Sequence, residues 1–89
     1  MPPLDIPRSA HAALEYAAHL RTLSIRALID LQHQLNIAVM TAAYAALDGN
    51  PDPDQAHIKR AQDLVHAEHV RRNPAMAIIL RVPIRPQAA

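Results

Sequence analysis

The chain contains neither proline nor glycine between Pro7 and Gly49. These two residue types end helices more often than any others, and most residues in this interval are strong helix formers. Ser9 is a suitable N-cap at the start of the interval. The sequence therefore predicts one helix over residues 9–47, roughly 58 Å long at 1.5 Å per residue.

The stretch "DGNPDPD" after this interval predicts a turn. Gly49 can end the first helix, and the two following prolines stiffen the connection. Asp54 can cap a second helix, which we predict over residues 54–72. Because short connections favour antiparallel neighbours, the sequence predicts an all-α fold built on an antiparallel helical hairpin. Residues 1–89 form a single small domain in this interpretation, with residues 1–8 as an extended N-terminal arm.

The C-terminal segment is compatible with two structures. Asn73 as an N-cap and Pro74 at the first helical position favour a short helix over residues 75–82. The apolar residues that follow also alternate with period two, which favours a strand. These residues are Met76, Ile78, Leu80, Val82 and Ile84. We favour the helix and keep the strand as the alternative; residues 82–89 are expected to be an extended tail.

The two predicted helices differ in apolar content. Residues 9–47 carry 14 large apolar side chains, whereas residues 54–72 carry four. A helix that is apolar on most of its circumference has to be buried on most of it. A chain of 89 residues without cysteine has a small core and no disulfide to support it. We therefore predict a helical bundle formed with a second copy or with an obligate protein partner.

The predicted association surface lies on the first helix, where leucine and valine side chains cluster on adjoining sides. It consists of Leu14, Leu20, Leu23, Leu28, Leu31, Leu35 and Val39.

Two groups of polar residues have the spacing of metal ligands. The first group stands at i, i+4 and i+8 on the first helix, and the second stands three residues apart on the second helix. The members are His11, Glu15 and His19 in the first group, and His66 and His69 in the second. An antiparallel hairpin brings the two groups toward the same end, which makes a metal-binding bundle an alternative function. Solvated helix faces explain the same residues more simply, so the sequence predicts no metal and no cofactor.

Composition argues against several other functions. One glycine cannot build a phosphate-binding loop, and Tyr16 and Tyr44 are the only aromatic side chains. Ser9 and Ser24 are the only serines, and neither lies in a glycine-framed turn, so we predict no enzyme. The net charge is only +1. A nucleic-acid-associated protein therefore remains only an alternative, suggested by the basic C-terminal third.

The first residues do not show the pattern of a secretory signal, and no apolar run approaches the roughly 20 residues that span a bilayer. We expect a location in the cytoplasm or within a larger assembly, and no membrane span.

Two partial resemblances accompany this interpretation. The order of a long helix, "LDGNPDPD", a second helix and an apolar end resembles the small hairpin subunits of type III secretion needles. That resemblance covers about half of the chain and implies a filament subunit, although Pro74, Pro83 and Pro86 depart from that family's continuous C-terminal helix. The hairpin size and "HAEHVRRNP" resemble encapsulated ferritin-like proteins, although Glu15 is the only glutamate on the first helix.

Neither resemblance assigns the chain to a family. The leading hypothesis is a non-enzymatic structural or interaction protein: a small assembly, adaptor or inhibitor subunit that acts through an apolar helix face.

Overall fold

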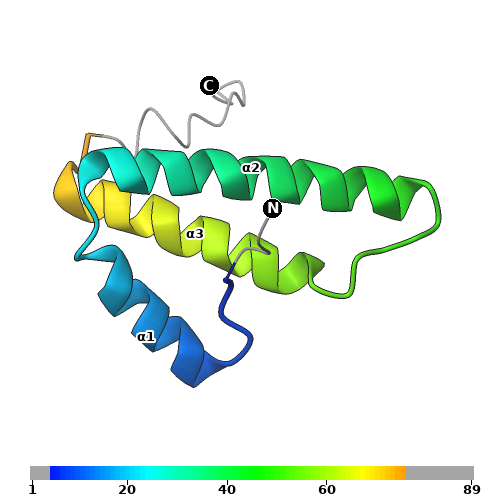
Figure 1. Ribbon diagram of the computed structural model, residues 1–89, viewed down its shortest axis with the longest axis horizontal. Coiled ribbons are helices and arrows are strands. Elements are labelled where there is room, and N and C mark those ends of the chain that lie inside the picture. Colours follow the sequence, from blue (N-terminus) through cyan, green and yellow to red (C-terminus); the bar gives the residue numbers. More distant parts are fainter. Residues whose placement is uncertain (1–4, 76–89) are drawn as a thin grey trace, which may run out of the picture.

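The computed structural model describes residues 5–75, and this part of the chain is all-helical, without strands. Its helices are α1 (Ala10–Leu20), α2 (Ile25–Leu47) and α3 (Gln55–Arg72). Helices α2 and α3 lie side by side, and α1 packs against α3 (Figure 1). The all-α prediction is thus confirmed for these residues. The described residues end at Ala75. The predicted helix or strand over residues 75–82 and the predicted tail 82–89 therefore lie outside them, apart from Ala75 itself.

The prediction of one unbroken helix over residues 9–47 is wrong, because the chain turns at residues 21–24. Ser24 has an extended backbone, with φ −64° and ψ 161°. Its hydroxyl oxygen accepts a hydrogen bond from the backbone N–H of Ala27 at 3.1 Å. Ser24 therefore caps a new helix, and the turn allows α1 to fold back onto α3 instead of extending α2.

Helix α1 begins as the sequence predicts. The Ser9 hydroxyl oxygen accepts a hydrogen bond from the backbone N–H of Ala12 at 3.0 Å. The first turn of α1 therefore has a side-chain partner for one of its free N–H groups.

Helix α2 ends at the predicted glycine. Gly49 has a φ of +85°, a conformation that glycine adopts at little cost. Its backbone N–H donates to the carbonyl of Ala46, and the backbone N–H of Asn50 donates to the carbonyl of Ala45. These paired bonds satisfy the last carbonyls of the helix and direct the chain into the connection to α3.

Asp54 occupies the N-cap position of α3, as predicted, but its side chain makes no capping hydrogen bond. Its carboxylate instead forms an ion pair with Arg8. The N-terminal arm is thereby tied to the start of α3.

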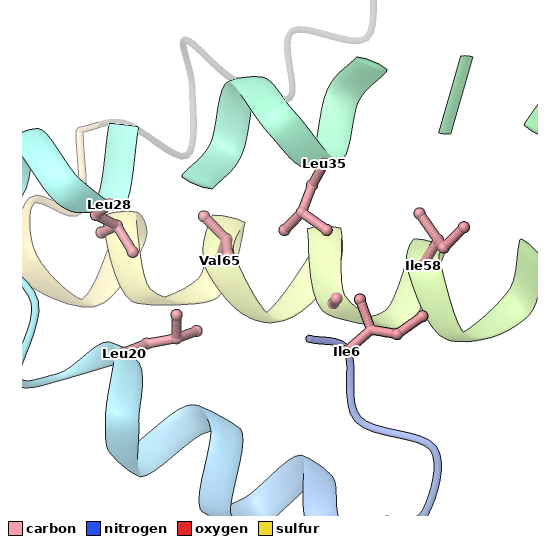
Figure 2. Packing of buried hydrophobic residues seen from close by; sticks show 7 residues of the cluster. Ile6, Leu20, Leu28, Leu35, Ile58 and Val65 are labelled. Atoms are coloured by element: carbon pink, nitrogen blue, oxygen red, sulfur yellow. The ribbon is translucent and has the colours of Figure 1, made fainter. Parts of the chain in front are cut away.

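The core lies between the three helices and the N-terminal arm. Leu20, Leu28, Leu35 and Val65 are fully buried, and Ile6 of the arm reaches the same cluster. Figure 2 shows these side chains converging from α1, α2, α3 and the arm. The turn at residues 21–24 has a clear benefit: it brings Leu20 and Leu28 to opposite sides of one core, which a straight helix would prevent.

Candidate functional site

The most polar cluster of the fold lies at the end of α3. Glu68 is only 5% exposed, and its carboxylate accepts hydrogen bonds from two guanidinium groups. Arg71 donates from Nε and Nη2 at 3.0 and 2.7 Å, and Arg72 donates from Nε at 2.7 Å. Glu68 thus pairs with Arg72, four residues later and so a neighbour on the helix surface, and Arg71 adds a second partner.

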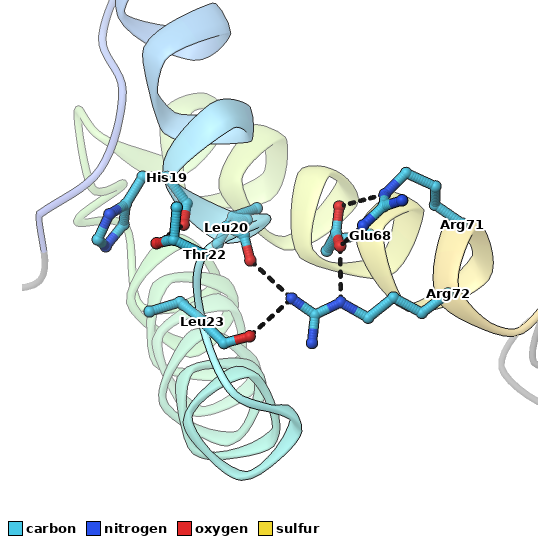
Figure 3. Close-up of polar contacts among 7 residues, drawn as sticks. All are labelled: His19, Leu20, Thr22, Leu23, Glu68, Arg71 and Arg72. Atoms are coloured by element: carbon cyan, nitrogen blue, oxygen red, sulfur yellow. Dashed lines mark hydrogen bonds and ion pairs between the residues drawn. The ribbon is translucent and has the colours of Figure 1, made fainter.

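Arg72 also holds the turn between α1 and α2. Its Nη2 donates to the backbone carbonyls of Leu20 and Leu23, at 2.9 and 2.8 Å (Figure 3). In a continuous helix these carbonyls would accept from the backbone N–H groups of Ser24 and Ala27. In the turn the backbone N–H of Leu23 donates to the carbonyl of Leu20, and the guanidinium group adds a second donor there and supplies the donor for the carbonyl of Leu23. The geometry assigns this cluster a structural role in fixing the turn.

The two arginines determine the charge state of Glu68. Hydrogen bonding from Arg71, followed by that from Arg72, lowers the pKa of Glu68 from 4.5 to about 2, although burial acts in the opposite direction. The pKa of His69 is also lowered, mainly because burial disfavours the charged imidazole and also because of the nearby positive charge of Arg72. Both shifts mean that acid destabilises the folded chain.

We expect a loss of stability on acidification in two stages. A group with a depressed pKa stabilises the fold above its unfolded pKa, and that contribution is lost as the pH falls through the folded value. His69 loses its contribution as the pH falls below 6.5, and Glu68 does so between pH 4.5 and about 2. Urea denaturation at a series of pH values measures this. Glu68→Gln should flatten the lower stage, whereas Asp63→Asn should leave it in place, because the partner of Asp63 among residues 5–75 is Lys59 on the exposed side of α3.

His66 and His69 lie against the protein interior. The Nε2 atoms of both side chains are buried and have no hydrogen-bond partner among the described residues, and His69 is only 4% exposed. From the sequence, these histidines are expected to be part of a solvated helix face, whereas the structure buries the Nε2 atoms of both. A buried neutral imidazole fits the lowered pKa of His69.

The residues considered as metal ligands are not brought together. His11 and Glu15 form an exposed ion pair, with 3.0 Å between Nε2 and Oε1. Within residues 5–75 no group of three or more His, Asp or Glu side chains is placed to hold a metal ion. The proposed approach of His11 or His19 to His69 therefore does not produce a ligand set in the described fold.

A cavity of about 360 Å³ lies beside the N-terminal arm. Its polar lining comes from Asp5, Glu15, Tyr16 and His19. Burial, and to a lesser extent Asp5, raises the pKa of Tyr16, whose hydroxyl group has no partner among the described residues. Within this lining, Glu15 forms an ion pair with His11.

Most residues of the predicted association surface lie within the chain's own core. Leu20, Leu28 and Leu35 are fully buried. The remaining members on or next to α2 pack partly buried against the same core: Leu23, Leu31 and Val39. Leu14 on α1 is 73% exposed. These side chains therefore stabilise the single chain, and the exposed apolar surface lies elsewhere on α2.

The outer face of α2, as we call it, carries six large apolar side chains that are between 41% and 82% exposed. They are Ile25, Ile29, Ile37, Met40, Tyr44 and Leu47. At 100° per residue they fall on one side of the helix, roughly opposite the buried Leu28, Leu35 and Ala42. The inner and outer faces of α2 thus both carry large apolar side chains, and among residues 5–75 only those of the inner face are covered. Sequence reasoning identified the excess of apolar residues but did not separate these two faces.

Comparison of the chain with protein-family models, with curated proteins and with solved structures gave no significant match. None of the helices in the described part of the chain is long and apolar enough to cross a membrane.

Proposed function

We propose that this chain is a non-enzymatic interaction protein, a small assembly, adaptor or inhibitor subunit that associates with a second copy of itself. The observation that supports the proposal is the outer face of α2. Six exposed large apolar side chains on one side of a 23-residue helix, interrupted only by His33 between Ile29 and Ile37, are unusual for a protein that remains a monomer. The α2–α3 pairs of two copies would then form a helical bundle with the two α2 helices at its centre.

Energetic considerations favour coverage of this face. Each large apolar side chain contributes about 1.5–3 kcal/mol when it passes from full exposure to full burial. The chain's own core is small, with eight buried apolar residues in the described part. The outer face of α2 carries six exposed large apolar side chains beside these eight buried residues, and association would bury them.

Size-exclusion chromatography with light scattering on a dilution series of the full chain tests the proposal. We expect a mass of twice 9.8 kDa or a larger multiple at high concentration, falling toward the single-chain mass on dilution. A protein that remains at the single-chain mass at every concentration up to the millimolar range would contradict the proposal.

A further inference from the structure

The outer face of α2 has a spacing that matches itself when the helix is reversed. With the exposed His33 filling the gap between Ile29 and Ile37, its positions follow one another at intervals of three and four, the pattern that packs one helix against another. Reversal about the midpoint between Asn36 and Ile37 exchanges Ile29 with Tyr44 and brings Met40 opposite His33. An interface formed by two-fold symmetry requires this property, because the same surface has to fit both copies.

Charges at the two ends of the face complement each other under the same reversal. Arg26 near the start of α2 comes next to Asp48, which ends the helix in the second copy. Both side chains are exposed, and no ion pair found among residues 5–75 engages either of them. A parallel arrangement would place Arg26 beside Arg26 of the other copy and Asp48 beside Asp48, and like charges repel.

From these two observations we infer that the second copy packs antiparallel, outer face against outer face, with the two-fold axis passing α2 between Asn36 and Ile37. The inference rests on the proposed function and specifies the partner surface. Each Ile37 contacts the Ile37 of the other copy. Each Ile29 contacts Tyr44 of the other copy, and each Arg26 pairs with Asp48. Contacts of this kind between the two α2 helices fix one orientation. They exclude an open-ended filament, because a two-fold contact closes on itself.

Single-cysteine variants test this arrangement, since the natural chain has no cysteine. We expect Ile37→Cys to form a disulfide-linked dimer under mild oxidation, because this position meets its own copy near the axis. Ile29→Cys alone is expected not to cross-link, because the two thiols would lie roughly 22 Å apart along the axis at 1.5 Å per residue. An equal mixture of Ile29→Cys and Tyr44→Cys should give the cross-linked heterodimer.

Gln34→Cys is a matched control, because this exposed residue lies on a different side of α2 from the outer face. Efficient self-linking of Ile29→Cys would overturn the antiparallel arrangement in favour of a parallel one, while the proposed function would stand. An associated protein in which Ile37→Cys stays reduced would also overturn it. If the light-scattering mass is that of a single chain, the proposed function itself fails. This is the mass expected if residues 76–89 of the same chain cover the outer face of α2.

Discussion

Ile37→Asp is expected to convert the associated protein into a folded monomer. Ile37 is 66% exposed in the single chain, so aspartate at this position removes little from the core. In the proposed dimer it places two carboxylates face to face in a desolvated interface, where like charges cannot be relieved by water. We expect the dissociation constant to rise about 100-fold, equivalent to about 2.7 kcal/mol. Sedimentation velocity at several concentrations measures the change.

Gln34→Asp is the matched control for this substitution. It introduces the same residue into the same helix at an exposed position away from the outer face. We expect it to leave the mass unchanged, and circular dichroism should show the same helix content in both variants. Equal masses for Ile37→Asp and the natural protein at every concentration would show that the outer face of α2 does not carry the association.

Arg72→Ala is expected to lower the free energy of unfolding by about 2–3 kcal/mol. The substitution removes one of the two partners of the buried Glu68 carboxylate. It also leaves the carbonyls of Leu20 and Leu23 without the guanidinium donor that holds the turn. Urea denaturation at neutral pH measures the loss, and hydrogen exchange should show weaker protection of the amides of Ala27 and Leu28, which donate to Ser24.

Two further variants separate this role from a general effect of charge. Arg60→Ala removes an exposed arginine from the same helix and should change stability by less than about 0.5 kcal/mol. Arg72→Lys keeps the charge, but a single ammonium group cannot reproduce the planar set of donors that reaches Glu68 and both carbonyls. We therefore expect an intermediate loss for lysine. Equal stability of Arg72→Ala and Arg60→Ala would rule out the proposed role of Arg72.

Local signals in the sequence predict several of the helix boundaries well. Gly49 ends α2 with the positive φ that its position suggests, and α3 spans Gln55–Arg72, close to the predicted 54–72. Ser9 caps α1 as expected. The contact between Glu68 and Arg72 also follows from spacing, because residues four apart on a helix are neighbours.

The turn at residues 21–24 could not be predicted in the same way. It contains no proline or glycine, and the carbonyls of Leu20 and Leu23 accept hydrogen bonds from Arg72, about 50 positions later in the chain. Burial of Leu20 against Val65 and Leu28 is likewise a long-range effect. Ser24 before an apolar run was the one local signal available, and its cap proved decisive.

The excess of apolar residues on the first predicted helix indicated that more surface has to be buried than the second helix can cover. In the structure, the apolar residues of α2 are divided between a buried face and an exposed face, which the prediction did not distinguish. Leu28 and Leu35 face α3, and Ile29 and Met40 remain exposed on the other side of α2. The count of apolar residues was informative, but the choice of face depends on where α1 and α3 pack, which no local pattern specifies.

The contact of Arg72 with the turn also has a consequence for the order of folding. A ribosome makes the chain from its N-terminus, so residues 9–47 emerge before the guanidinium group that holds their turn. Until α3 has been synthesised and docked, the turn is favoured by local bonds: the cap of Ser24, the Thr22 hydroxyl donating to the carbonyl of His19, and the backbone bonds of Thr22 and Leu23. The hydrogen bonds between Arg72 and the turn therefore form late in folding. Their formation requires the C-terminal end of α3 to have docked in its native position.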